Sequence, residues 1–176
     1  MRITSIRRLA VVAGGGAAAL TVVAGSAMGM TGSTITGTGH GEDLRGTDGA
    51  DVLLAFGGQD WLYADGGNDE AYGGTGGDYL YGGPGRDEVR GGTGRDGFIP
   101  GGQRDRVFGG DGKDIVYLAK DHRTDKVHCG ADFDRVYGAM KRDDVADDCE
   151  FVTSDPPSCR TLPTRSVTVA AEPARC

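Results

Sequence analysis

The sequence predicts an all-β fold built from short, regularly repeated strands. The first reason is three consecutive nine-residue blocks at 73–81, 82–90 and 91–99, each with Gly at places one, two and four, Asp at place six and an apolar residue at place eight. The second is the glycine content, 33 of 176 residues, against a usual fraction of about 7%. The third is alternation, because the residues at places seven to nine of a block would form a strand whose side chains point outward, inward and outward in turn.

The nine-residue period extends over residues 37–117. Place six is acidic in every block, at Glu42, Asp51, Asp60, Asp69, Asp78, Asp87, Asp96, Asp105 and Asp114. Place eight is apolar in every block, at Leu44, Leu53, Leu62, Ala71, Leu80, Val89, Phe98, Val107 and Val116. The place-four Gly is absent only at His40 and Gln103. A flexible linker would not keep such a register, so the glycines indicate tight turns.

These blocks resemble the calcium-binding nonapeptide of the RTX, or hemolysin-type, family, whose consensus is GGxGxDxUx with an apolar U. The resemblance implies a right-handed parallel β-roll in which two blocks make one coil of 18 residues. Residues 37–117 would then form four and a half coils. Each ion would lie between one loop and the loop two blocks later on the same edge.

Calcium is the expected ligand because it prefers carboxylate and carbonyl oxygens. The predicted ligands are Asp51, Asp60, Asp69, Asp78, Asp87, Asp96, Asp105 and Asp114, with the turn residues Gly74, Gly76, Gly83, Gly85, Gly92, Gly94, Gly110 and Gly112. The predicted pairs on one edge are Asp51 with Asp69, Asp69 with Asp87, and Asp87 with Asp105. On the other edge they are Asp60 with Asp78, Asp78 with Asp96, and Asp96 with Asp114. For any single Asp, a solvated turn residue is the alternative.

The loops differ in how closely they match the calcium-binding consensus. Asp78, Asp87, Asp96 and Asp114 have the best loops, whereas Pro100 and Gln103 weaken the loop of Asp105. The Glu42 loop is expected to be empty because it carries Thr38 and His40. One core place in nine residues gives little apolar burial to offset a backbone entropy of about 1–2 kcal/mol per residue. Folding is therefore expected to require bound calcium.

The N-terminal region predicts export. Residues 1–27 read as a signal peptide, with Arg2, Arg7 and Arg8 before an apolar run and small residues at Gly25-Ser26-Ala27. A membrane anchor is the alternative, although the run is shorter than the roughly 20 residues of a span. Removing it would change the net charge from −7 to −10 and leave a secreted, extracellular chain. Residues 28–36 are predicted as a linker that ends in a possible capping strand.

The C-terminal region predicts a cap and a tail. The period breaks after Tyr117 and resumes at Asp125, Asp134 and Asp143, so 118–153 is predicted to keep the strands and lose the metal loops. Residues 127–152 resemble the closing segment of secreted actinobacterial RTX-like proteins. Residues 154–176 contain four of the six prolines and are predicted as a loosely ordered tail.

All four cysteines follow the repeats. An even count in an exported chain predicts two disulfides, with three possible connectivities. The favoured pairs are Cys129–Cys149 and Cys159–Cys176. A zinc site is the alternative, but no CxxC or neighbouring His pair supports it.

One outer face of the predicted roll is aromatic, with Trp61, Tyr63, Tyr79 and Tyr81 in its rows. Such a face suits a protein or glycan partner, or it is covered by the cap or tail. The acidic charge argues against nucleic acid, and against a membrane once the signal is removed. No HExxH, GxSxG or Cys/His arrangement points to an enzyme. The leading prediction is a secreted, non-enzymatic calcium-binding protein, and the alternative is an adhesion or assembly module that works through the aromatic face.

Overall fold

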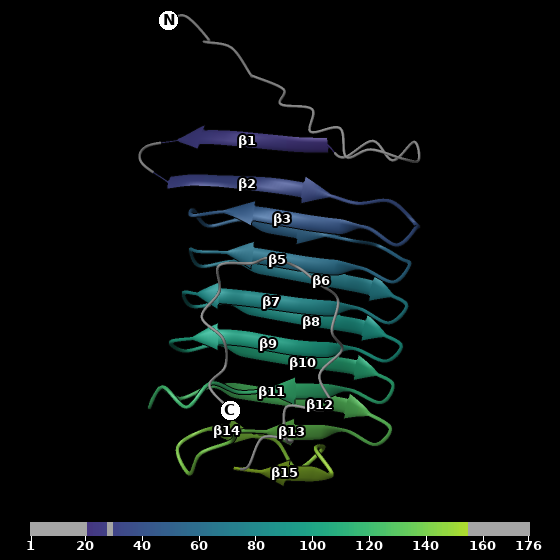
Figure 1. Cartoon of the computed structure of the whole chain (residues 1–176), viewed down its shortest axis with the longest axis vertical. Coiled ribbons are helices and arrows are strands. Elements are labelled where there is room, and N and C mark those ends of the chain that lie inside the picture. The colour runs from purple at the N-terminus through teal and green to yellow at the C-terminus, as the bar shows by residue number, and fades with distance from the viewer. Residues whose placement is uncertain (1–20, 28–29, 155–176) are drawn as a thin grey trace, which may run out of the picture.

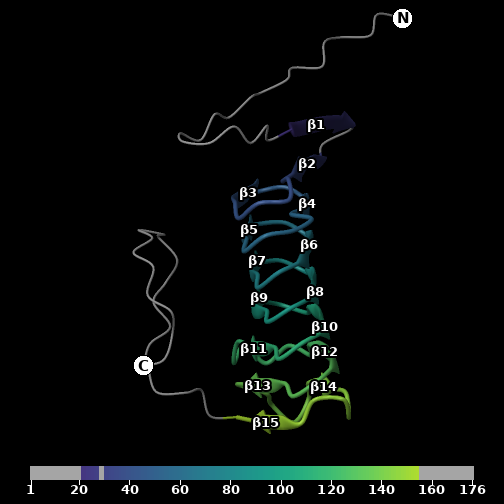
Figure 2. The same ribbon diagram turned by 90° about the vertical axis from the view of Figure 1, so that its right-hand side faces the viewer.

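The computed structural model describes residues 21–27 and 30–154, and these residues form a stack of strands in two facing sheets (Figures 1 and 2). The eight-stranded sheet has the order β1-β2-β4-β6-β8-β10-β12-β14, and the seven-stranded sheet has the order β15-β13-β11-β9-β7-β5-β3. The first sheet contains β1 (Thr21–Ala27), β2 (Met30–Thr36), β4 (Val52–Leu54), β6 (Glu70–Thr75), β8 (Glu88–Thr93), β10 (Arg106–Asp111), β12 (Lys126–Ala131) and β14 (Asp144–Val145). The second contains β3 (Asp43–Thr47), β5 (Trp61–Asp65), β7 (Tyr79–Pro84), β9 (Gly97–Gly102), β11 (Ile115–Tyr117), β13 (Arg135–Tyr137) and β15 (Phe151–Thr153). None of the described residues is helical, so none belongs to a helix that could span a membrane.

Two blocks form one coil, as the sequence predicts. From β2 to β15, consecutive strands alternate between the sheets, and each strand up to β13 pairs in parallel with the strand two places later in the chain. Leu62 of β5, for example, pairs with Leu80 of β7. The fold is an all-β parallel solenoid of about seven turns, which is consistent with an RTX β-roll. It has more turns than the four and a half expected for 37–117, because β2 and the strands from β12 to β15 use the same coil geometry.

The core is a single column of apolar side chains between the sheets. Place eight of every block from Leu44 to Val116 is at most 1% exposed, while the residues at places seven and nine are less buried. Ile35, Val127 and Val136 extend the column at its two ends. The predicted alternation out, in, out is therefore confirmed.

Glycine is needed at place four for two reasons, which Gly94 illustrates. Its φ is +129°, a conformation that side-chain-bearing residues rarely adopt. A Cβ there would also lie 1.7 Å from the carbonyl oxygen of Gly76 in the preceding coil. Gln103 stands at the same place with φ +83°, so its loop deviates from the glycine geometry without leaving the stack.

The break in the period lengthens one coil but leaves the strands in register. Val107 of β10 pairs with Val127 of β12, and Val116 of β11 pairs with Val136 of β13, each 20 residues later instead of 18. The two extra residues lie in the connection between Tyr117 and Lys126, where His122 has a φ of +65°. Strands β12 to β15 thus continue the two sheets beyond residue 117.

The first strands lie in segments that the sequence assigns to other roles. β2 covers most of the predicted linker 28–36 and pairs in parallel with β4, and its Ile35 is buried. β1 lies inside the predicted signal peptide and pairs antiparallel with β2. Signal cleavage stays a prediction, and it would leave β2 as the edge strand.

Candidate metal sites

The place-six carboxylates lie in two columns, one along each edge of the roll. Each one follows a glycine turn and comes immediately before a strand, so the repeat brings every second block to the same edge. The aspartates are at most 2% exposed, although their side chains offer little apolar surface to bury. They are Asp51, Asp60, Asp69, Asp78, Asp87, Asp96, Asp105, Asp114, Asp125 and Asp134. Buried carboxylates are uncommon unless a partner compensates for the lost hydration.

Hydrogen bonds connect successive carboxylates within each column. The amide of Asp78 donates to Oδ1 of Asp96 at 2.8 Å, and the amide of Asp96 donates to Oδ1 of Asp114 at 2.9 Å. The same bond joins all six predicted pairs, at 2.7–2.9 Å: Asp51–Asp69, Asp69–Asp87, Asp87–Asp105, Asp60–Asp78, Asp78–Asp96 and Asp96–Asp114. One oxygen of each carboxylate is therefore used by the protein itself.

The second oxygen of most of these carboxylates has no protein partner. Eight buried Oδ2 atoms accept no hydrogen bond: those of Asp60, Asp69, Asp78, Asp87, Asp96, Asp105, Asp114 and Asp134. A buried acceptor left unsatisfied costs about 1–3 kcal/mol, and more when it is charged. A bound cation would satisfy these atoms, and a donor set of oxygens alone suits Ca²⁺.

Burial raises the pKa of these carboxyls, because it penalises the charged form. The pKa rises from 3.8 to about 6 for Asp60 and Asp69, about 7 for Asp87 and Asp96, and about 8 for Asp105. The hydrogen bond from the preceding coil opposes the rise, and the neighbouring carboxylates of the column add to it. A divalent cation would reverse this balance by favouring the ionised form.

The turn glycines leave room for backbone carbonyls close to these oxygens. A Cβ at Gly91 would lie 2.2 Å from Oδ2 of Asp96 and 2.7 Å from the carbonyl oxygen of Gly109. Carboxylate and carbonyl oxygens of adjacent coils thus approach the same point. The prediction of turn residues omitted this place-one Gly, although the opening Gly-Gly of the blocks could have revealed it.

The predicted turn glycines at places two and four all have positive φ values, between +100° and +154°. They are Gly74, Gly76, Gly83, Gly85, Gly92, Gly94, Gly110 and Gly112. Each is also packed so tightly against a carbonyl of the preceding coil that no Cβ would fit. Their first structural role is therefore to let the loops stack.

Asp51 differs from the other predicted ligands because both of its carboxylate oxygens accept hydrogen bonds from the protein, and the second accepts them from its own loop. Oδ1 accepts the amide of Ser33 at 2.5 Å, and Oδ2 accepts the amide of Thr47 at 2.5 Å and its hydroxyl at 2.9 Å. Glu42, expected to be metal-free, accepts the amide of Thr38 at Oε2 and its hydroxyl at Oε1. Thr at place two thus donates hydrogen bonds to the carboxylate of each of the first two loops.

The columns continue into the predicted cap, which the sequence analysis expected to lack metal loops. The amide of Asp105 donates to Asp125 at 3.0 Å, and that of Asp114 donates to Asp134 at 2.7 Å. The resumed nine-residue rhythm from Asp125 to Asp143 was the sequence signal for this. Asp143 closes its column, because its Oδ2 accepts the amide of Met140 at 2.7 Å.

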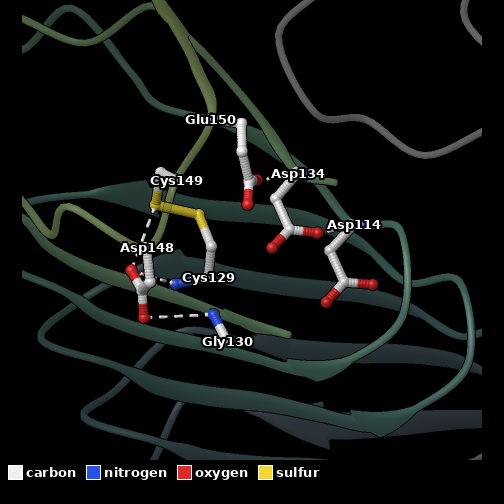
Figure 3. The surroundings of a disulfide bond; sticks show 7 residues. All are labelled: Asp114, Cys129, Gly130, Asp134, Asp148, Cys149 and Glu150. Atoms are coloured by element: carbon white, nitrogen blue, oxygen red, sulfur yellow. Dashed lines mark hydrogen bonds between the residues drawn. A yellow bond between two sulfur atoms is a disulfide. The ribbon is translucent and has the colours of Figure 1, made fainter. Parts of the chain in front are cut away.

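The predicted disulfide between Cys129 and Cys149 is present (Figure 3). These two cysteines and Asp148 form the one cluster of three His, Cys, Asp or Glu residues within metal-binding distance in the described part of the chain. Both sulfurs are bonded to each other, so the cluster offers no thiolate to zinc. The predicted pair Cys159–Cys176 lies outside the described residues.

Comparison with known proteins agrees with this geometry. The family model described as RTX calcium-binding nonapeptide repeat matches four times, over residues 36–71, 63–98, 72–107 and 101–125. No curated protein and no solved structure is detectably similar to the chain, and no catalytic family matches it. The matched segments together cover just over half of the 176 residues, so the chain belongs to the family of RTX calcium-binding nonapeptide repeat proteins.

Proposed function

We propose that this chain is a secreted, non-enzymatic protein in which several Ca²⁺ ions, held between glycine turns of adjacent coils, complete the fold. The observation that carries the proposal is the set of eight buried carboxylate oxygens without a partner. They repeat along both edges, and the family match covers seven of the eight residues.

The proposed ligands are the carboxylates of stacked loops and the carbonyls of their turns. On one edge, ions are expected between the loops of Asp69 and Asp87, and of Asp87 and Asp105. On the other edge they are expected between Asp60 and Asp78, Asp78 and Asp96, and Asp96 and Asp114. Asp51 is the first aspartate of its column, and its Oδ2 already accepts a hydrogen bond from the hydroxyl of Thr47. Its loop is therefore expected to contribute least to the ion beside Asp69.

Calcium is needed because little else stabilises the roll. The core is one side chain wide, and Gly loses more conformational freedom on folding than any other residue. Without a cation, carboxylates stack at about the strand spacing of 4.8 Å and repel one another. The binding free energy of the ions is then part of the folding free energy.

The test is circular dichroism of the purified protein after calcium removal and after its return. We expect a spectrum dominated by unfolded chain without metal and a β-sheet spectrum with Ca²⁺. Mg²⁺ at the same concentration is the control, and it should restore less structure because it demands a small octahedral site. Identical spectra with and without Ca²⁺ would refute the proposal.

Export is supported by the N-terminal sequence and by the disulfide between Cys129 and Cys149, since disulfides persist in oxidising compartments. Mass spectrometry of protein collected from the culture medium tests it. A mature chain that begins at Met28 is the expected result.

A second candidate function, an adhesion or assembly module, is favoured by the aromatic side of the seven-stranded sheet. Trp61 stacks on Tyr79 with ring centroids 4.4 Å apart, and Tyr63 stacks on Tyr81 at 4.9 Å. Beside them is a hollow of about 520 Å³ whose walls include Tyr79, Tyr81, Gly97, Ile115 and Tyr117. Half-buried aromatic rings beside a hollow suit a protein or glycan partner.

Capture of partners from the native cell surface, with and without Ca²⁺, distinguishes the two functions. The adhesion role predicts a partner that wild type retains in calcium and Tyr81→Ala loses. The control is Phe108→Ala, which changes an aromatic residue of the opposite sheet. Equal capture by both variants would argue against a working aromatic face.

A further inference from the structure

The loop from Cys129 to Asp134 has the backbone of a metal loop, although it lies beyond the residues that match the family. Gly130 and Asp132 have φ values of +107° and +80°, and they occupy the places of Gly110 and Gly112 in the coil before. Gly110 pairs with Gly130 in the sheet. The amide of Gly112 also donates to the carbonyl of Ala131 at 3.0 Å, as place-four amides do inside the repeats.

The carboxylates of Asp134 and Asp114 are buried, and only one oxygen of each accepts a hydrogen bond. Asp134 is 0% exposed and Asp114 is 1% exposed. Oδ1 of Asp134 accepts the amide of Asp114, while Oδ2 of each residue has no partner. Figure 3 shows the two side chains extending in the same direction from adjacent coils. No ion pair among the described residues includes either carboxylate.

The backbone carbonyl oxygen of Cys129 lies close to Oδ2 of Asp114. A Cβ at Gly109 would be 2.5 Å from Oδ2 of Asp114 and 2.2 Å from the carbonyl oxygen of Cys129. Inside the repeats, Gly91 has the same relationship to Asp96 and Gly109. The donor set of the array is therefore reproduced in the cap.

The disulfide fixes the end of this column. Cys149 is bonded to Cys129 and directly precedes Glu150, whose carboxylate accepts the amide of Asp134 at 2.8 Å. The carboxylate of Asp148 accepts the amides of Cys129 and Gly130, each at 3.2 Å. Glu150 thus takes the place that the next Asp would occupy, and the bridge holds it there.

We propose that the disulfide-closed cap contains a further Ca²⁺ site between the loops 109–114 and 129–134. Asp114 and Asp134 supply carboxylate oxygens to it, and Cys129 supplies its backbone carbonyl. The proposal rests on the proposed function, since it assigns calcium to the same kind of loop. It adds one site beyond the repeats, in a loop whose place-one residue is a cysteine instead of a glycine.

The test counts bound calcium in the oxidised full chain by native mass spectrometry and by calorimetric titration. Asp134→Asn is expected to bind one ion fewer than wild type and to keep the others. The matched control is Asp147→Asn, which removes the same charge from an exposed residue of the cap outside the two loops and should leave the count unchanged. An unchanged count in Asp134→Asn overturns the further site, whereas a wild type that binds no calcium overturns the proposed function itself.

A measurement on the unmodified chain avoids any folding defect of the variant. Crystals of the oxidised protein grown with Sr²⁺ in place of Ca²⁺ are expected to show an anomalous peak between Asp114 and Asp134. Peaks along the repeats together with none at this position would overturn the further site and leave the proposed function standing.

Discussion

The backbone amide of Asp96 donates to the carboxylate of Asp114 at 2.9 Å, although 18 residues separate the two in the chain. The carboxylate of Asp96 in turn accepts the amide of Asp78 at 2.8 Å. Each internal aspartate therefore connects three coils, through a donor toward one neighbour and an acceptor toward the other. A change at one aspartate should affect two metal sites.

Asp96→Asn tests this sharing. The variant weakens the sites on both sides of the substituted loop, because the amide oxygen is a poorer calcium ligand than a carboxylate. Even outer-shell changes typically cost about 10–100-fold in metal affinity, so at least a tenfold rise in the calcium midpoint of folding is expected. The control Asp111→Asn removes the same charge from an exposed place-three residue and should shift the midpoint little. Equal midpoints for the two variants would contradict the shared role of Asp96.

The metal-free protein should be more stable in acid than at neutral pH. The folded pKa values of Asp87, Asp96 and Asp105, about 7, 7 and 8, exceed the ordinary 3.8. The folded state therefore binds protons more tightly than the unfolded state, and the free energy of unfolding falls as the pH rises from about 4 to about 8. With Ca²⁺ bound the trend should reverse, because the ion requires the ionised carboxylates. The β-sheet circular dichroism signal of the metal-free protein at pH 4.5 and 7.5 measures the first trend, and urea unfolding of the Ca²⁺-bound protein at the same two pH values measures the second. A metal-free protein that gains sheet signal toward pH 7.5 would show the sign to be wrong.

Thr47→Val should weaken the fold without changing the number of bound ions. The substitution removes the hydroxyl that Asp51 accepts at 2.9 Å and keeps the shape of the side chain. The loss of one such bond should lower the free energy of unfolding by about 1–3 kcal/mol, since the carboxylate is buried. Thr93→Val, at an exposed place three, is the control. If Thr47→Val lowers the calcium count, the loop of Asp51 binds an ion after all.

Phe98→Ala should cost about 3–5 kcal/mol of unfolding free energy at saturating calcium, as large-to-small changes in packed cores do. Phe98 is fully buried, and it is the largest side chain in a core only one residue wide. Phe56→Ala is the control, because Phe56 is 58% exposed. Urea titrations of the two variants give the comparison, and similar losses would mean that the column of apolar side chains contributes little.

The double variant Cys129→Ser/Cys149→Ser should lower the melting temperature and loosen the cap. Opening a closed loop of about 20 residues costs roughly 3 kcal/mol in the chain-entropy model. Hydrogen exchange should speed up at Asp134 and in β15, while β7 and β8 keep their protection as long as Ca²⁺ is present. Uniform loss of protection along the whole chain would contradict a local role for the bridge.

The strands and the buried core could be predicted because both follow from a residue pattern of fixed period, and the coil length was implied by the resemblance to the RTX family. Leu80 lies inside the roll for the same reason as Leu62, and the sequence contains that reason directly. The place of Asp134 was harder to predict. Its loop lacks the place-one and place-four glycines, and only the structure shows that Asp132 adopts the positive φ of a place-four glycine.

The nine-residue period also does not predict that both carboxylate oxygens of Asp51 accept hydrogen bonds. This bonding depends on the backbone of Thr47, which keeps an ordinary φ, whereas place two from Phe56 onward in the repeats has a positive φ. Nine-residue spacing gives the position of a carboxylate along an edge. Whether its free oxygen meets a hydroxyl or stays open depends on one neighbouring side chain.

The ends of both columns close on the protein's own groups, at Thr38 and Thr47 on one side and at Met140 and Glu150 on the other. An internal duplication of 18 residues would therefore lengthen the molecule by one coil, about 4.8 Å, without disturbing either terminus. Gene duplication can therefore change the length of the roll in equal steps of one coil, and each added coil would bring its own ion-binding capacity.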